Sequence, residues 1–178
     1  MDLDEASTLF KTVRSLERPL GVEIGRFKGG STFLIASALK PGGRLLSIDL
    51  HSALSADGVK YDDELVEALR KVGRAQNVEL IVADNRTYPN AALSLDFLFI
   101  DGDHSYEGVK QDFEHWAGTL KVGGHLLFHD DRPEKPGVWR FLRELEGRKD
   151  SGLQKVRTVG SVSHFVRSAP PPRSRPAA

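Results

Sequence analysis

The stretch that decides the fold is Gly21–Ser31, with the sequence GVEIGRFKGGS. A short apolar run at 20–24 leads into it, and a pattern typical of a helix, at 30–39, follows it. A strand, a glycine-rich turn and a helix N-terminus together form a nucleotide-binding corner. Gly25 allows a sharp turn and a close approach of the backbone to a ligand, because it has no Cβ. The N–H groups at the helix start then offer hydrogen-bond donors.

Two residues of this turn bear on which nucleotide it binds. A dinucleotide fingerprint reads G-x-G-x-x-G, but Phe27 stands at the second glycine position and would block a pyrophosphate. Glu23, at the end of the strand, does not belong to that fingerprint either. An acid at this position suits a ligand with a positive group, such as the amino group of S-adenosylmethionine.

The run E-I-G-R-F-K-G-G-S at 23–31 resembles motif I of class I S-adenosylmethionine-dependent methyltransferases. It is most similar to the branch with E-x-G-x-x-x-G-x-S, as in the catechol O-methyltransferase family. The resemblance implies that S-adenosylmethionine is the cofactor and that five residues of the motif help to bind it: Glu23, Gly25, Arg26, Gly29 and Ser31. The alternative interpretation is a glycine-rich turn that binds nothing.

Composition limits the class of protein. The 178 residues suffice for one domain with a real core. The 25 basic and 25 acidic residues give no net charge, which argues against a nucleic-acid partner. The absence of cysteine excludes disulfides and thiol chemistry. The N-terminus is acidic, unlike a secretory signal, and no apolar run is long enough to span a membrane. We therefore expect a soluble, cytoplasmic protein without a membrane partner.

Strand-like and helix-like segments alternate along the chain, which predicts a parallel sheet with helices on both faces. Helices are expected at 4–16, 30–39, 63–73, 105–120 and 137–145, with a short helical turn at 88–93 and a loop at 51–62. Strands are expected at 20–24, 44–48, 78–83, 95–100, 125–128, 153–159 and 162–166, the fifth after a turn at 123–124.

The last two expected strands read as a hairpin. The prediction is an α/β fold with a doubly wound, mostly parallel, seven-stranded sheet and a terminal antiparallel hairpin, Rossmann-like and similar to class I methyltransferases. One domain should cover 1–167. The Pro- and Arg-containing tail at 168–178 lacks large apolar side chains and should be disordered.

Ligands of open α/β sheets lie beyond the carboxyl ends of the strands, and here nearly every strand ends in an acid. Asp49 can accept hydrogen bonds from ribose hydroxyls, although it could instead cap a turn. In the methyltransferase pattern, Asp84 and Asn85 meet the adenine amino group; an Asx-turn is the alternative. Asp101 completes the expected cofactor site.

The segment FLFIDGDHSY at 97–106 carries the second strong signal. The simple interpretation is that Asp103 or Ser105 caps a helix. In the related methyltransferases the first aspartate, here Asp101, ligates a divalent metal. The remaining ligands would follow the fifth strand, as Asp130 and Asp131, and carboxylate oxygens suit Mg²⁺.

The metal motif departs from the catechol type, whose second pair is Asp-Asn, so the ligand register of 129–131 stays open. Sugar and natural-product O-methyltransferases, with D-G-D and D-D pairs, match better. A solvated turn before Pro133 is the alternative. The catechol-type lysine is absent, and Asp103 or His104 could serve as the general base.

The sequence therefore predicts an O-methyltransferase that uses S-adenosylmethionine and a divalent metal, with a small-molecule or glycan acceptor. The alternatives are an NAD or nucleotide-sugar Rossmann enzyme and a degenerate methyltransferase fold that serves as a binding module. Little of the chain is left to cover the strand ends, so we expect a homodimer.

Overall fold

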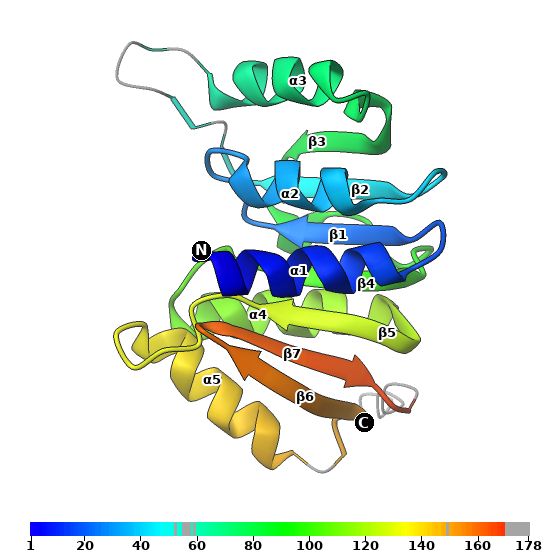
Figure 1. The fold of residues 1–178 in the computed structure, drawn as a ribbon. Coiled ribbons are helices and arrows are strands. Elements are labelled where there is room, and N and C mark those ends of the chain that lie inside the picture. Colours follow the sequence, from blue (N-terminus) through cyan, green and yellow to red (C-terminus); the bar gives the residue numbers. More distant parts are fainter. Residues whose placement is uncertain (52, 55–57, 59, 149, 170–178) are drawn as a thin grey trace.

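A seven-stranded sheet forms the centre of the protein (Figure 1). The computed structural model describes residues 1–51, 53–54, 58, 60–148 and 150–169. The strand order is β3-β2-β1-β4-β5-β7-β6. The strands are β1 (Leu20–Ile24), β2 (Arg44–Asp49), β3 (Val78–Val82), β4 (Leu95–Ile100), β5 (Leu120–Phe128), β6 (Leu153–Val159) and β7 (Val162–Arg167).

The first five strands are parallel, and β7 pairs antiparallel with both β5 and β6. The order reverses between β1 and β4, where the chain winds first toward β3 and then toward β5. Such a switch point opens a crevice at the carboxyl ends of the strands. The predicted doubly wound sheet with its terminal hairpin is confirmed.

Helices cover both faces of the sheet. Side chains alternate between the faces of a strand, so Phe97 and Phe99 pack with one set of helices while Leu98 and Ile100 pack with the other. The helices are α1 (Leu3–Ser15), α2 (Gly30–Ala38), α3 (Tyr61–Lys71), α4 (Tyr106–Trp116) and α5 (Pro136–Gly147). The first three lie on the Phe97 side, and α4 and α5 lie on the other.

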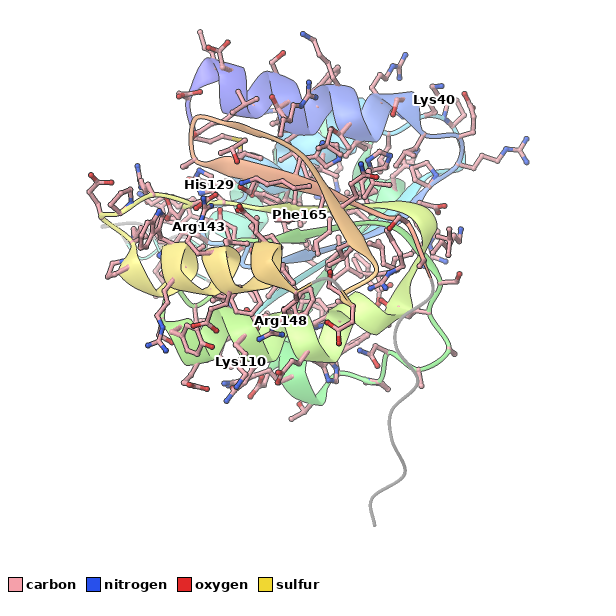
Figure 2. The ribbon with its side chains drawn as sticks, turned by 90° about the horizontal axis from the view of Figure 1, so that it is seen from below. Lys40, Lys110, His129, Arg143, Arg148 and Phe165 are labelled. Atoms are coloured by element: carbon pink, nitrogen blue, oxygen red, sulfur yellow. The ribbon has the colours of Figure 1, made fainter. Side chains whose placement is uncertain are left out.

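The terminal hairpin closes the core on the α5 side. Phe165 of β7 is buried and makes an edge-on contact with Phe128 of β5. Figure 2 shows the side chain of Phe165 on the side of the hairpin that faces α5. Burial of such a large aromatic side chain stabilises the antiparallel edge of the sheet.

The structure corrects two of the predicted elements. Strand β5 begins at Leu120, five residues early, because the expected turn at 123–124 is a bulge inside the strand; Gly123 has a φ of 84° there. The short helical turn is at Asn85–Thr87 and not at 88–93. The expected tail, from residue 170, and part of the expected loop at 51–62 lie outside the described residues. In the described part of the chain, no helix has the length and apolar character needed to cross a membrane.

Candidate active site

A cavity of about 610 Å³ lies at the carboxyl ends of the parallel strands. Most of the residues predicted for the site share its wall. These are Gly25, Asp49, Asp84, Asn85, Asp101, Asp103, His104 and Asp130. The other predicted residues do not line it: Glu23, Arg26, Gly29, Ser31 and Asp131.

Glu23 is completely buried at the end of β1. Its Oε2 accepts hydrogen bonds from Thr32 Oγ1 at 2.5 Å and Ser47 Oγ at 2.6 Å. Burial raises the pKa of Glu23, although these hydroxyls and that of Ser31 oppose the shift. The carboxyl group therefore joins β1 to β2 and to the start of α2, behind the wall of the cavity.

Gly25 and Gly29 set the path of the turn. Gly25 has a φ of 87°, and a Cβ there would lie 2.1 Å from the carbonyl oxygen of Asp101. Gly29 is the N-cap of α2 with a φ of 83°, and as a glycine it gives the N–H groups of that helix start no side-chain hydrogen bond. From the sequence, the lack of a Cβ at Gly25 was expected to allow the close approach of a ligand. The structure shows that a Cβ there would collide with the backbone after β4 first.

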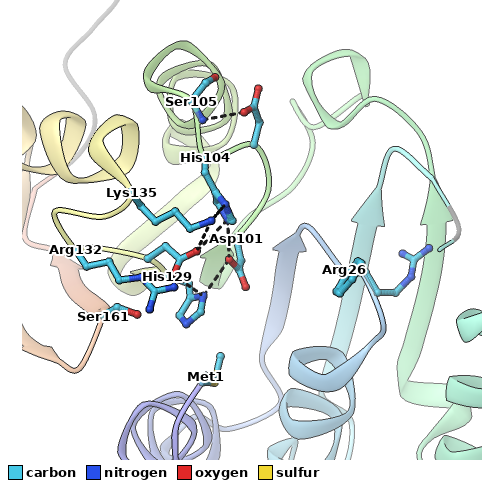
Figure 3. A network of polar contacts seen from close by, with 12 residues as sticks. Met1, Arg26, Asp101, His104, Ser105, His129, Arg132, Lys135 and Ser161 are labelled. Atoms are coloured by element: carbon cyan, nitrogen blue, oxygen red, sulfur yellow. Dashed lines mark hydrogen bonds and ion pairs between the residues drawn. The ribbon is translucent and has the colours of Figure 1, made fainter. Parts of the chain in front are cut away.

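Arg26 does not face the cavity. Its guanidinium is buried, donates to Asp62 through Nε at 2.7 Å and Nη2 at 2.9 Å, and donates to the Ser47 carbonyl at 2.7 Å. Figure 3 shows Arg26 far from the Asp101 side of the site. The structure therefore does not bring the Arg26 side chain to the cavity, because these contacts hold the loop after β1 onto β2 and α3.

Asp49 at the end of β2 holds the same turn. Its Oδ2 accepts from the backbone N–H groups of Arg26 at 2.7 Å and Phe27 at 2.8 Å, and its Oδ1 accepts from that of His51 at 3.1 Å. Phe27 is 67% exposed, has a φ of 48° and lines the cavity. The carboxylate therefore shapes the motif I turn as well as standing in the cavity wall.

The β3 end of the cavity contains a residue that the sequence interpretation missed, Asp112 of α4. Asn85 donates to Asp112 Oδ1 at 3.0 Å and accepts from Trp116 Nε1 at 3.0 Å. Burial raises the pKa of Asp112 to about 6, despite the hydrogen bond from Asn85. A signal was present, because Asp112 lies on the inward face of the helix between Val109 and Trp116.

At the β4–β5 end, three donor groups converge (Figure 3). Ligand atoms of Asp101, His104 and Asp130 all lie within 4.8 Å of one another. His104 Nε2 is 3.5 Å from Asp101 Oδ1 and 3.3 Å from Asp130 Oδ2. Asp130 has a φ of 62°, a conformation that aspartate adopts more readily than most residues.

Basic side chains surround this cluster. His129 Nδ1 lies 3.1 Å from Asp101 Oδ1, Lys135 Nζ lies 2.9 Å from His104 Nδ1, and Arg132 Nη2 lies 2.6 Å from Asp130 Oδ1. Burial raises the pKa of Asp101, but His104 and His129 outweigh it, so the net pKa is lowered. Burial likewise lowers the pKa of His129, yet Asp101 and its other acidic neighbours raise it overall. The cluster therefore keeps an ionised carboxylate in the cavity wall.

Asp131 is not part of the cluster. It accepts from Arg143 Nη2 at 2.7 Å and from Ser163 Oγ at 2.5 Å. Since Arg143 belongs to α5, this carboxylate is held on the α5 side of the strand end. The structure therefore does not bring Asp131 to the other two expected ligands, and His104 lies where the third donor was expected. Asp103, the other candidate base, is exposed, and its Oδ1 accepts from the Ser105 N–H at 2.8 Å.

Comparison with known proteins decides the family. The family model described as "Methyltransferase domain" matches residues 22–130, more than half of the chain. The chain belongs to this methyltransferase family. Its fold is that of class I methyltransferases, so the resemblance inferred from motif I is confirmed.

Relatives of this methyltransferase domain come from distant organisms. The uncharacterized protein R132 of Acanthamoeba polyphaga mimivirus is 33% identical over 142 residues, covering 73% of this chain and 62% of R132. The chain spans less than two thirds of the length of the curated relatives it matches.

Two solved structures share the methyltransferase fold. A methyltransferase from Geobacter sulfurreducens aligns with a TM-score of 0.71 at 21% identity, covering 95% of this chain and 81% of that one. The O-methyltransferase TomG from Streptomyces achromogenes, in complex with SAM, aligns with a TM-score of 0.66 at 21% identity, covering 95% and 82%.

Proposed function

We propose that this protein is an S-adenosylmethionine-dependent O-methyltransferase in which Asp101, His104 and Asp130 hold a divalent metal beside the acceptor hydroxyl. The observation that carries the proposal is the convergence of these three donors in the wall of the cavity that also contains Gly25 and Asp49. The TomG structure, which contains SAM in a protein of the same fold, supports the choice of cofactor.

The three donors fit a divalent cation. Two carboxylate oxygens suit Mg²⁺ or Mn²⁺, and a neutral imidazole adds a ligand that Mn²⁺ accepts. Mg²⁺ needs only one or two carboxylates, since water and substrate oxygens complete its shell. Lys135 and Arg132 offset part of the charge of Asp130.

A bound cation would supply a Lewis acid that lowers the pKa of the acceptor hydroxyl. The protein's own residues do the rest. His129 holds Asp101 in place and ionised, and the turn at Gly25 brings the β1 end next to Asp101. Because the Nε2 of His104 would be a ligand of that cation, Asp103, the other candidate base in the cavity wall, is the group left to receive the hydroxyl proton. Alignment of the oxygen with the methyl group is the main source of rate.

Calorimetry with S-adenosylhomocysteine and with NAD tests the cofactor. The protein should bind the former and not the latter; the opposite result favours an NAD-type Rossmann enzyme. Methyl transfer to a panel of catechols and sugar hydroxyls then tests the reaction. Binding without any transfer would fit the degenerate fold used as a binding module.

The metal is tested by removal and by substitution. Transfer should stop in excess chelator and return with Mg²⁺ or Mn²⁺. Asp101→Asn should lose transfer but keep S-adenosylhomocysteine binding, since the cofactor contacts are expected mainly at β1 to β3. Glu107→Gln is the matched control, because Glu107 is exposed on α4. Full activity in excess chelator would refute the metal and leave His104 and Asp101 as a metal-free acid–base pair.

A further inference from the structure

At the β3 end of the cavity, the two side chains expected to meet adenine are already engaged. Arg86 binds both oxygens of the Asp84 carboxylate, through Nε at 2.7 Å and Nη2 at 2.8 Å. Asn85 uses its amide nitrogen on Asp112 and its amide oxygen on Trp116. These contacts hold the loop after β3 in place. They also mean that both polar groups of the Asn85 side chain already have protein partners.

Asp112 has the opposite character. Its side chain lines the cavity, yet the residue is only 3% exposed. Oδ1 accepts the hydrogen bond from Asn85, whereas Oδ2 is buried and has no hydrogen-bond partner among the described residues. A Cβ on Gly102 would lie 3.1 Å from Oδ2, so the glycine leaves the space beside this oxygen open. Buried carboxylate oxygens without partners are uncommon because their desolvation is not repaid.

The surroundings of Asp112 Oδ2 favour a hydrogen bond from an uncharged donor. Asp84 and Asp103 add negative charge near it, and Arg86, whose guanidinium is held by Asp84, offsets part of that charge. A neutral N–H group on a ligand would satisfy Oδ2 without adding charge. Adenine substituted at N9 has one such group on its ring system, the exocyclic amino group at C6.

We propose that Asp112 recognises the adenine base of the cofactor by accepting a hydrogen bond from its exocyclic amino group at Oδ2. The inference rests on the proposed function, because it assumes an adenosyl cofactor in this cavity. It moves base recognition from the loop after β3 to helix α4. A base with a carbonyl oxygen at C6 would place two acceptors against each other and should be rejected.

The test compares S-adenosylhomocysteine and S-inosylhomocysteine by calorimetry. These two compounds differ only at the C6–N1 edge of the base, where the amino group and the N1 acceptor of adenine are replaced by a carbonyl oxygen and an N1–H donor. Wild-type protein should bind the inosyl compound about tenfold to a hundredfold more weakly, the usual cost of leaving a buried acceptor unpaired. Asp112→Asn should reduce this preference to about threefold or less, because the new amide can still accept from Asn85 and can donate to the inosyl oxygen. Glu114→Gln, an exposed position on α4, is the matched control and should keep the wild-type preference.

The outcomes separate the two proposals. If wild type binds S-adenosylhomocysteine and Asp112→Asn keeps the full preference, the role of Asp112 is overturned while the proposed function stands. If wild type binds neither compound, the proposed function fails and the role of Asp112 fails with it. Should Asp112→Asn not fold, as judged by its thermal melt, wild type alone decides. Equal binding of the two nucleosides refutes the inference, and a clear preference for the adenosyl compound supports it.

Discussion

The substitution Asp112→Asn should stabilise the ligand-free protein. Burial raises the pKa of Asp112 from 3.8 to about 6, so near neutral pH the folded state holds a carboxylate that it disfavours. One pKa unit corresponds to about 1.36 kcal/mol, so this shift amounts to a penalty of about 3 kcal/mol. Asparagine keeps the shape and the hydrogen bond from Asn85 but carries no charge. For a chain of this length, the melting temperature should rise by roughly 10 °C.

The pH dependence identifies the cause. The folded-state pKa of Asp112 lies above its unfolded value, so stability falls as pH rises from 3.8 to about 6, and the penalty is complete above that window. Urea denaturation of both proteins should show the full difference at about pH 7.5 and little difference near pH 4. A variant that is no more stable than wild type at the higher pH would refute the reasoning. An equal gain at both pH values would assign the effect to packing.

Three further predictions concern other parts of the structure. Asp49→Ala should weaken S-adenosylhomocysteine binding by about 1–3 kcal/mol in calorimetry, because Asp49 both shapes the motif I turn and faces the cavity; unchanged affinity would contradict its placement in the site. Gly25→Val should abolish binding and lower the melting temperature measured by circular dichroism, since its Cβ would collide with the Asp101 carbonyl; a stable variant that binds normally would exclude this contact. Burial raises the pKa of Glu5, but hydrogen bonds from Ser161 and Asp2 outweigh it and leave the pKa at about 2. Glu5→Gln should therefore lower the free energy of unfolding above pH 4.5, and the loss should shrink as the pH falls toward 2; a pH-independent difference would rule out the carboxylate charge as its source.

Local pattern was enough for the architecture. Apolar runs of strand length alternate with helical periodicity from residue 20 to residue 147, and that alternation permits few arrangements other than a doubly wound sheet. The positive φ at Gly25 follows from the lack of a Cβ, and the acids lie at or just after the ends of the five parallel strands, which the apolar runs locate. Both are local properties, so they could be predicted from the sequence alone. The cavity wall at Asp49, Asp101 and Asp130 followed from them.

The directions of the side chains in the site could not be predicted from the sequence, because they depend on partners that are distant in the sequence. Asp130 and Asp131 look equivalent in the chain, but the left-handed backbone at Asp130 helps to direct one carboxylate to His104 while the other meets Arg143. Arg26 lies in the middle of motif I, yet its guanidinium donates a hydrogen bond to Asp62, 36 residues away in the sequence. Asp112 reads as one polar residue on a helix, and only the approach of Asn85, 27 residues earlier, shows which of its oxygens is left for a ligand. Contacts of this kind form only when the sheet has brought the strand ends to one edge, which is why the tertiary structure, and not the local pattern, selects the atoms of the site.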